Sequence, residues 1–135
     1  MQILRFDHST LVVKDLEQSR WFYGDVLKLK EVPRPSTFTF GGLWFQGAGF
    51  QIHLIDARDT AAPSGFGVPR EAARTGRGHH LAFEVAHLNE WLAYLQSRGI
   101  EVVGGPQERG DGAIQAFVED SDSHLLEFFA WNSPQ

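Results

Sequence analysis

The amino-acid sequence predicts an α+β fold in which two tandem modules of about 60 residues each run strand, helix and then further strands. Three observations lead to this prediction. Two pairs of distant segments resemble one another at a near-constant spacing, short apolar segments alternate with turn residues, and each half contains apolar residues at helical spacing. The chain of 135 residues is therefore predicted to form a single domain, residues 1–135, from a duplicated unit.

The first pair of similar segments holds two histidines. DHSTLVV at 7–13 and HHLAFEV at 79–85 each have His in second place and Val in last place, so His8 and His80 lie 72 positions apart. Apolar and β-branched residues dominate both segments, which is typical of strands. We therefore expect His8 and His80 to occupy equivalent places on the first strand of each module.

The second pair holds a histidine and a glutamate. FQIHLI at 50–55 and HLLEFF at 124–129 each place one polar side chain among apolar ones, and these two residues, His53 and Glu127, lie 74 positions apart. Two separate matches at nearly the same offset are rarely produced by chance. His53 and Glu127 are therefore predicted to occupy equivalent places on the last strand of each module.

Module one spans about 3–55 and is predicted to open with a strand over Ile3–Val13. Asp15 follows as a helix N-cap, with Gln18 three positions on to complete a capping box. Apolar residues at helical spacing predict a helix over 16–27. Four short segments after it are predicted strands: Leu29–Val32, Thr37–Phe40, Leu43–Gln46 and Phe50–Ile55.

Module two spans about 78–131 and has the same predicted order. Gly78–Val85 is a predicted strand, and LNEWLAYL at 88–95 places apolar residues on one face of a helix, with Gly99 as its stop. The remaining predicted strands are Val102–Val103, Ile114–Glu119 and Leu125–Trp131. Between the modules, 56–77 shows little periodicity and several Pro and Gly residues, so it is predicted to be a linker, either functional or a simple tether.

Composition excludes several classes of protein. The formal net charge is −5, whereas a nucleic-acid-binding protein normally carries a basic excess, so no nucleic-acid partner is expected. The chain has no Cys, which excludes a Cys-ligated zinc or iron–sulfur site. No apolar run approaches the ~20 residues that cross a bilayer, and the first ten residues lack the zones of a signal peptide. We therefore expect a cytoplasmic protein without a membrane partner.

Four side chains are candidates for a metal site. If the modules are related by an approximate two-fold arrangement, His8, His53, His80 and Glu127 converge, and three imidazoles with one carboxylate suit a divalent first-row ion. Each residue also has an ordinary interpretation, because a single His in a strand is usually a core or surface residue and Glu127 can face solvent on a half-exposed strand. Gln51 lies two residues from His53 and shares its face. His124 falls in a turn, where solvent exposure is expected.

These segments belong to longer stretches that resemble the vicinal oxygen chelate superfamily, which contains glyoxalase I, methylmalonyl-CoA epimerase, fosfomycin-resistance enzymes, extradiol dioxygenases and bleomycin-resistance proteins. The stretches that carry the resemblance are DHSTLVVKDLEQSRWFYGDVLKLKEV at 7–32, GHHLAFEV at 78–85 and EDSDSHLLEFF at 119–129. Lys28 stands where the family often has Gly. Ser121 and Ser123 replace the Pro and Gly of the family's turn before the metal-binding Glu.

The resemblance implies two tandem βαβββ modules that form a curved mixed sheet around a central cleft. By position, His8, His80 and Glu127 correspond to the family's metal ligands, and His53 stands where glyoxalase I has Glu. His53 is then either a fourth ligand or a nearby acid/base. The implied cofactor is one divalent ion, namely Zn, Ni, Mn, Co or Fe. Family members of about this length usually form homodimers, so a homodimer is implied as well.

The implied function is that of a metal-dependent lyase, isomerase or epimerase acting on a small oxygenated molecule through a metal-stabilised enolate or alkoxide. Glu127 is the candidate base and His53 the second acid/base. Two alternatives stay open: an extradiol-type dioxygenase, and a metal-free small-molecule binding protein like those of bleomycin resistance. The residues expected to contact substrate are Phe38, Phe40, Trp44, Phe45 and Phe117 as walls, with Gln46 and Gln51 as polar contacts.

Overall fold

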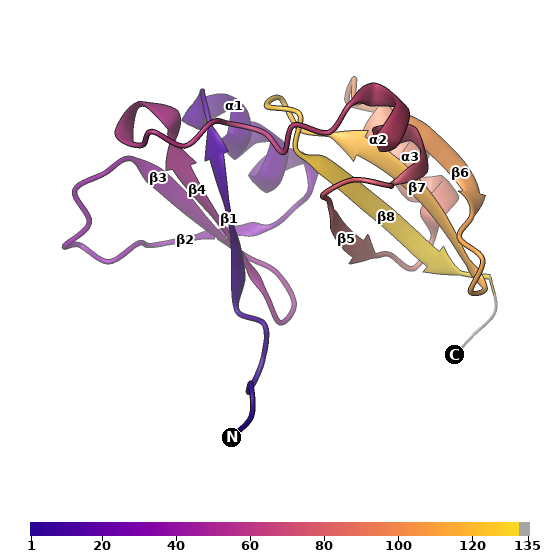
Figure 1. The fold of residues 1–135 in the computed structure, drawn as a ribbon, viewed down its shortest axis with the longest axis horizontal. Coiled ribbons are helices and arrows are strands. Elements are labelled where there is room, and N and C mark those ends of the chain that lie inside the picture. Colours follow the sequence, from indigo (N-terminus) through magenta and orange to yellow (C-terminus); the bar gives the residue numbers. More distant parts are fainter. Residues whose placement is uncertain (133–135) are drawn as a thin grey trace. The chain divides into compact units, whose positions relative to one another are not determined.

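Each half of the chain folds around its own four-stranded mixed sheet (Figure 1). The computed structural model describes residues 1–132, and the chain divides into two compact units, Met1–Gly65 and a second unit that begins at Phe66. The α+β class and the strand–helix–strands order of both modules are confirmed. The central cleft expected with them stays a prediction.

Unit one has the strand order β1-β4-β3-β2. β1 runs parallel to β4, whereas the β4–β3 and β3–β2 pairs are antiparallel. Its elements are β1 (His8–Val13), α1 (Leu16–Arg20), the π-helix η1 (Trp21–Val26), β2 (Lys30–Val32), β3 (Gly42–Gln46), β4 (Gln51–Asp56) and the 3-10 turn η2 (Ala57–Asp59).

Unit two repeats this topology with the strand order β5-β8-β7-β6, in which β5 is parallel to β8 and the other pairs are antiparallel. Its elements are α2 (Arg70–Thr75), β5 (Leu81–Glu84), α3 (Leu88–Ser97), β6 (Gly104–Glu108), β7 (Ala113–Glu119) and β8 (Leu125–Trp131). Among the described residues 1–132, no helix is long and apolar enough to cross a membrane.

The strand register confirms the internal repeat residue by residue. In unit one Thr10 on β1 lies opposite His53 on β4, and in unit two Ala82 on β5 lies opposite Glu127 on β8. Thr10 and Ala82 are 72 positions apart, which is the spacing of His8 and His80, and His53 and Glu127 are 74 positions apart. His53 and Glu127 therefore occupy the same place on the last strand of their respective sheets.

The helix of unit one begins as the sequence predicts and then changes its winding. Asp15 caps α1, because its carboxylate accepts hydrogen bonds from the backbone N–H groups of Glu17 and Gln18. The chain continues as the π-helix η1 and leaves it through Lys28, whose φ of 64° lies in the left-handed region. The position where the family often has Gly thus requires left-handed backbone, and Lys28 adopts it at some conformational cost.

Apolar burial explains why both helices lie on their sheets. In unit one, η1 buries Phe22, Tyr23 and Val26, and β3 buries Phe45. In unit two, α3 buries Leu88, Leu92 and Leu95, which is the face predicted from the sequence, and it ends at Ser97 just before Gly99, whose φ is 80°. Each buried side chain of this size contributes about 1.5–3 kcal/mol of apolar transfer free energy.

Four strand predictions were wrong, two in their extent and two entirely. Gly78–Val85 is too long, because β5 covers only Leu81–Glu84, and His80 lies just before this strand. The first strand begins at His8 rather than Ile3, because β4, its partner, begins at Gln51, which lies opposite His8. The predicted strand Thr37–Phe40 is instead a loop, and the backbone N–H of Phe38 donates to the carbonyl of Pro35. Val102–Val103 is not a strand, since β6 begins at Gly104, just after this segment.

The segment 56–77, predicted to be a linker, contains two helical turns. η2 directly follows β4 in unit one, and α2 packs against β6 in unit two. Ala73 of α2 is buried with Phe117 and Leu125, so this part of the segment contributes to the core of unit two. Gly76 ends α2 with a φ of 72°, and a Cβ there would lie 2.3 Å from the Phe117 ring. This glycine therefore allows helix and sheet to approach each other closely.

The end of β4 anchors the loop that precedes β3. Asp56 is buried, its backbone N–H donates to the carbonyl of Gly41, and the backbone N–H of Gly41 donates to Asp59. Arg58 donates hydrogen bonds to the Asp56 carboxylate from its side chain and from its backbone N–H. Chiefly because of the side-chain hydrogen bond, the pKa of Asp56 falls to about 2 from its ordinary 3.8.

Asp56→Asn is expected to lower the free energy of unfolding at pH 6 and to have progressively less effect toward pH 2. The folded-state pKa lies below the unfolded one, so the carboxylate stabilises the fold above about pH 4, and this contribution is lost as pH falls through about 2. Urea unfolding of both proteins at a series of pH values measures the difference. Glu108→Gln, at an exposed carboxyl on β6, is the control. A difference between wild type and the Asp56→Asn variant that stays constant with pH would contradict the assignment.

Candidate functional site

The four predicted metal ligands fall into two pairs, one in each unit. His8 and His53, together with Asp7 and Gln51, are called here the module-one half-site. His80 and Glu127, together with Arg109, are called the module-two half-site. Among residues 1–132, no group of three or more His, Asp or Glu side chains is close enough to form a metal-binding cluster. Each unit by itself contributes two of the four predicted residues.

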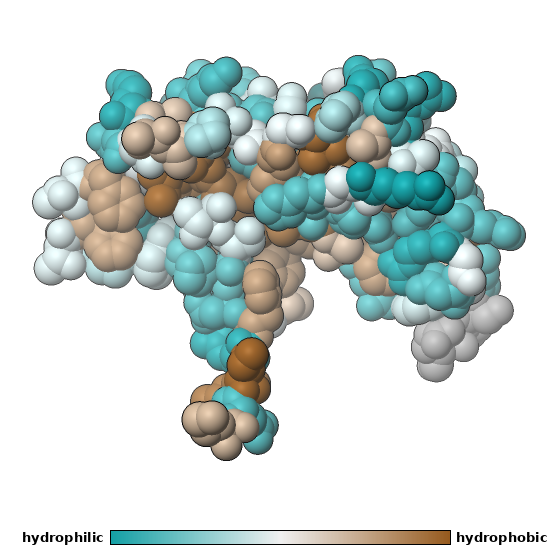
Figure 2. All heavy atoms as spheres, in the orientation of Figure 1, coloured by the Kyte–Doolittle hydropathy of each residue, from teal (hydrophilic) through white to brown (hydrophobic). Residues whose placement is uncertain are grey.

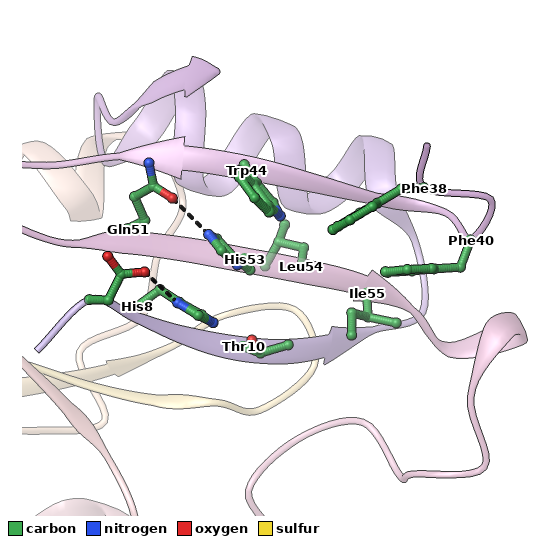
Figure 3. Close-up of a pocket in the computed structure, with 10 residues that line it drawn as sticks. His8, Thr10, Phe38, Phe40, Trp44, Gln51, His53, Leu54 and Ile55 are labelled. Atoms are coloured by element: carbon green, nitrogen blue, oxygen red, sulfur yellow. Dashed lines mark hydrogen bonds and ion pairs between the residues drawn. The ribbon is translucent and has the colours of Figure 1, made fainter. Parts of the chain in front are cut away.

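The module-one half-site lies in a pocket of about 520 Å³ (Figure 3). The imidazoles of His8 and His53 and the amide of Gln51 supply polar groups, whereas Leu54 and Ile55 supply aliphatic surface. Three aromatic side chains, Phe38, Phe40 and Trp44, also line it. The pocket thus combines a polar part, which can carry chemistry, with an apolar wall.

The pocket's rings form a continuous series. The His53 ring is stacked between Trp44, at 4.0 Å between ring centroids and an angle of 5°, and His8, at 3.9 Å and 17°. Phe38 lies edge-on to Trp44 and stacks on Phe40. Trp44 lies opposite His53 in the β3–β4 register, so the strand pairing itself places these two rings together.

A chain of hydrogen bonds fixes the tautomer of His53. The Gln46 amide nitrogen donates to the carbonyls of Gly47 and Phe50, which leaves Gln46 Oε1 to accept from Gln51 Nε2 at 2.7 Å. Gln51 Oε1 must then accept, and its partner at 2.7 Å is His53 Nε2. His53 therefore carries its proton on Nε2, and Nδ1 keeps the lone pair.

The surroundings of His53 also keep it neutral. Burial lowers the pKa of His53, and the nearby His8 and Arg34 lower it further against the opposing effect of Asp7. Asp7 in turn accepts a hydrogen bond from His8 Nδ1 at 2.7 Å, which is the main cause of the lowered pKa of Asp7. His53 is thus a neutral imidazole with an available lone pair, as a proton acceptor requires.

The stacking of His8 on His53 limits how both can act. A metal ion bound to an imidazole lies in the plane of that ring at about 2.0–2.1 Å from the nitrogen. The two rings are stacked with their centroids 3.9 Å apart and their planes inclined by only 17°, so the planes do not meet within about 2 Å of a nitrogen of each ring. In this arrangement His8 and His53 cannot both bind one ion, so only one of them fits the role of ligand.

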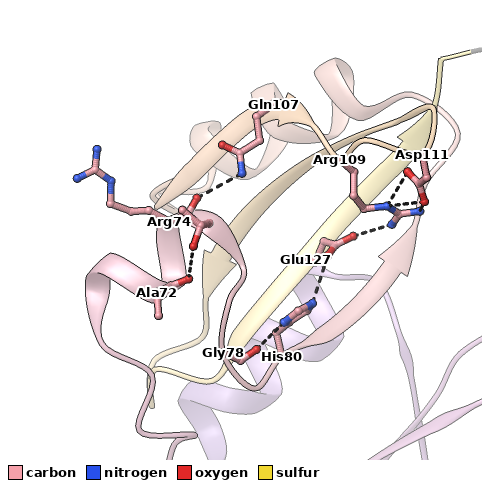
Figure 4. Close-up of polar contacts among 9 residues, drawn as sticks. Ala72, Arg74, Gly78, His80, Gln107, Arg109, Asp111 and Glu127 are labelled. Atoms are coloured by element: carbon pink, nitrogen blue, oxygen red, sulfur yellow. Dashed lines mark hydrogen bonds and ion pairs between the residues drawn. The ribbon is translucent and has the colours of Figure 1, made fainter.

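The module-two half-site pairs an imidazole with a buried carboxylate (Figure 4). His80 Nδ1 donates to the backbone carbonyl of Gly78 at 2.8 Å, and His80 Nε2 lies 3.2 Å from Glu127 Oε1. Glu127 is 4% exposed, and its other oxygen, Oε2, accepts from Arg109 Nη1 at 2.8 Å. Buried carboxylates persist only with such partners.

This geometry fits a divalent cation. With its Nδ1 proton donated to Gly78, a neutral His80 presents the Nε2 lone pair to a carboxylate oxygen, an arrangement that favours a cation or a proton between the two atoms. Two atoms bound to one ion at about 2.0–2.2 Å lie about 2.8–3.6 Å apart, and the observed 3.2 Å falls within this range. His8 and His80 share a further feature, because each has Nδ1 bound to an acceptor, as metal-binding histidines generally do.

The turn between β7 and β8 is stabilised by a buried pair of side chains, Asp120 and His124. Asp120 accepts from the backbone N–H groups of Asp122 and His124, and its second oxygen lies 2.7 Å from His124 Nδ1. His124 is 1% exposed, so the expectation of a solvated His124 was wrong. Ser123 has a φ of 66° in this turn, at the position where the family has Gly. The Asp120–His124 pair therefore fixes the turn and, through it, the register of β8 that carries Glu127.

The remaining predicted contact residues divide between pocket and core. Phe38 and Phe40 are 39% and 37% exposed, and Trp44 and Gln51 line the pocket beside them. Gln46 acts on the pocket only through Gln51. Phe45 and Phe117 are fully buried, and Phe117 lies in the core of unit two with its ring nearly perpendicular to that of His80.

Sequence reasoning missed two charged residues of these half-sites, Asp7 and Arg109, and also Asp111, which binds Arg109. Asp7 immediately precedes His8, and a carboxylate adjacent to a candidate ligand is a recognisable signal for a supporting partner. Arg109 and Asp111 lie in the hairpin between β6 and β7, within the sequence ERGDG. That sequence predicts a turn, and nothing in it predicts that Arg109 lies beside Glu127.

Comparison with known proteins identifies the class of this protein. The model of the Glyoxalase/Bleomycin resistance protein/Dioxygenase superfamily matches residues 5–128, and the chain belongs to that superfamily. It is 26% identical over 128 residues to Glyoxylase I 4 of Arabidopsis thaliana, a match that covers 94% of this chain and 71% of that protein. It is 27% identical over 130 residues to metallothiol transferase FosB of Staphylococcus saprophyticus, covering 93% and 76%.

A solved structure agrees at the level of the fold. The chain superposes on a glyoxalase family protein from Bacillus anthracis with a TM-score of 0.78 and 24% identity, and the match covers 98% of each chain. Both modules are therefore included in the shared architecture.

NMR of the imidazole nitrogens is expected to show His53 as the neutral tautomer protonated at Nε2 at pH 7, because Gln51 accepts from that atom. Gln51→Leu removes the acceptor and is expected to shift the ring toward a mixture of tautomers. Gln96→Leu, at an exposed position on α3, is the matched control and should leave the spectrum of His53 unchanged. Wild-type protein protonated at Nδ1 would show that the hydrogen-bond chain runs in the opposite direction.

Proposed function

We propose that this protein is a divalent-metal-dependent enzyme of the lyase, isomerase or epimerase type that acts on a small oxygenated molecule. The observation that carries the proposal is the His80–Glu127 pair, in which an anchored imidazole and a buried carboxylate face each other at a separation suited to two ligands of one ion. The name metallothiol transferase, borne by one relative, is in keeping with a metalloenzyme.

The proposed ligands are His8, His80 and Glu127. His8 and His80 each have Nδ1 committed to an acceptor, which leaves Nε2 to bind a metal, and Glu127 offers Oε1. This donor set of nitrogen and oxygen suits Zn, Ni, Mn, Co or Fe. A bound divalent ion would supply stabilisation for negative charge that develops on substrate oxygens, as in an enolate or alkoxide.

The proposed acid/base is His53. Glu127, the base expected from the sequence, has one oxygen bound to Arg109 and the other facing His80, so neither accepts a substrate proton without losing a contact. His53 is neutral, keeps the lone pair on Nδ1, and lines the pocket. It is therefore suited to take a proton from a carbon next to a carbonyl and to return it.

The pocket favours a substrate with an oxygenated end and an apolar remainder. Polar groups of His8, Gln51 and His53 would contact the former, and the wall of Phe38, Phe40 and Trp44 the latter. The two phenyl rings are well exposed and rest against Arg34, whose guanidinium carbon lies 5.2 Å and 4.8 Å from their centres. Arg34 also donates to the carbonyls of Phe40 and Gly42, so this wall is held in place.

Two alternative functions stay open. Two histidines and one carboxylate are also the ligand set of iron-dependent oxygenases, which favours an extradiol-type dioxygenase as the second candidate. Oxygen uptake with a catechol and ferrous iron, and none with other ions, would decide for it. A metal-free binding protein is the third candidate, and a ligand-induced rise in melting temperature that is unaffected by chelator would favour it.

We also propose that the protein forms a homodimer. The segment before β1 exposes its apolar side chains, with Ile3, Leu4 and Phe6 at 91%, 87% and 67% exposure. Figure 2 shows brown, hydrophobic spheres along the N-terminal arm. Contiguous exposed apolar side chains of this kind are characteristic of protein–protein contacts, and a second copy of the chain is the proposed partner.

Purified wild-type protein is expected to bind about one divalent ion per chain. His80→Ala is expected to lose it, because only two of the three proposed ligands, His8 and Glu127, remain. Elemental analysis after dialysis against zinc, nickel, manganese, cobalt and iron measures the content. His87→Ala, at an exposed helix N-cap, is the control for loss of an imidazole, and melting temperatures check that both variants fold. Wild-type protein that stays free of every ion would refute the metal-dependent proposal.

Replacing Ile3 and Leu4 together by Ser is expected to convert a dimer into a monomer. Light scattering should then report 15.2 kDa in place of twice that mass. Gln2→Ser alters the same arm without removing apolar surface and should leave the dimer intact. A wild-type protein that is monomeric at high concentration would exclude the homodimer.

A further inference from the structure

The Arg109 side chain connects two carboxylates in unit two (Figure 4). Its Nε lies 3.1 Å from both oxygens of Asp111, and its Nη2 lies 2.9 Å from Asp111 Oδ2. Its Nη1 donates to Glu127 Oε2 at 2.8 Å. The planar guanidinium is thus divided between a residue of the β6–β7 hairpin and the carboxylate proposed to bind metal.

The position of this guanidinium is set independently of Glu127. The backbone N–H of Arg109 donates to the carbonyl of Ala113, and the backbone N–H of Ala113 donates to Asp111, so the hairpin fixes both members of the pair. The guanidinium carbon also lies 4.1 Å from the centre of the Phe129 ring and 5.3 Å from that of Trp131, both on β8. β8 and the β6–β7 hairpin thus position the Arg109 guanidinium without any contribution from Glu127.

The two carboxylate oxygens of Glu127 consequently have different contacts. Oε2 is occupied by Arg109, whereas Oε1 faces His80 Nε2. A carboxylate free to rotate can bind a cation through both oxygens, but this one can offer only Oε1 without breaking a buried ion pair. The group of Asp111, Arg109 and Glu127 carries one net negative charge, which leaves it attractive to a cation.

We propose that Arg109, held by Asp111, is a positioning residue that restricts Glu127 to one metal-binding oxygen, Oε1, directed toward His80. The inference rests on the proposed function for its metal, and adds a residue that acts on that metal through Glu127. A merely structural ion pair would influence stability alone. A positioning residue also determines how the carboxylate coordinates and what His80 Nε2 faces.

Arg109→Lys tests this, because an ammonium keeps the charge but cannot span Asp111 and Glu127 as the planar guanidinium does. Cobalt(II) is the probe, and its affinity and visible absorption are recorded by titration. Arg109→Lys is expected to weaken Co²⁺ binding by about 10–100-fold and to reduce the intensity of the visible bands as Glu127 adds its second oxygen. Asp111→Asn should shift both in the same direction. Arg98→Lys, at the C-terminal end of α3, is the matched control and should behave as wild type.

A second readout needs no metal. In metal-free protein, Arg109→Lys is expected to shift the ring ¹⁵N resonances of His80, since the carboxylate facing Nε2 is no longer held. Unchanged His80 resonances, or an unchanged Co²⁺ affinity in a folded Arg109→Lys protein, would overturn the positioning role. If wild-type protein binds no Co²⁺ while the His80 resonances still shift, the contact of Arg109 with Glu127 stands, and the metal-dependent function is what fails.

Discussion

The parallel pairing of the first and last strands in each module is the constraint on which the rest of the structure depends. Backbone hydrogen bonds between β1 and β4, and between β5 and β8, bring together residues more than forty positions apart in the sequence. Because side chains alternate along a strand, this register decides that His53 shares its face with His8 and that Glu127 lies near His80. A slip of one residue in either pairing would turn these side chains to the opposite face.

The side chains around His53 and Glu127 then give these two residues different chemical environments. His53, stacked between two rings and bound through Nε2 to an amide chain, is neutral and keeps a lone pair. Glu127 is buried but shared between a guanidinium and an imidazole, so it is a held anion rather than a free base. Equivalent places in a duplicated fold thus hold side chains with different hydrogen-bond partners, because the side chains around them differ and the backbone does not.

Sequence reasoning succeeded where the signal is local or repeated. The cap at Asp15, the apolar face of α3 and the stop at Gly99 were predicted correctly, since each depends on residues within a few positions. It failed where strand pairing decides the structure. Residues 3–6 are as apolar as a strand, but no strand among residues 1–132 pairs with them, and Thr37–Phe40 is a loop followed by Gly41, which is hydrogen-bonded to Asp56 and Asp59. Burial of His124 was missed because its partner, Asp120, is recognisable only once the turn has formed.

The sequence by itself determined the duplicated α+β architecture, the superfamily and the equivalent places of His53 and Glu127 on β4 and β8, because a repeat offset and strand alternation translate directly into position. The tertiary structure alone decided which nitrogen or oxygen atoms of the candidate site residues are free of other hydrogen bonds and ion pairs. Whether His53 offers Nδ1 or Nε2, and whether Glu127 has one free oxygen or two, depends on Gln46, Gln51, Arg109 and Asp111. Hydrogen bonds and ion pairs act over about 3 Å in space, and no spacing along the chain predicts which side chains will come that close.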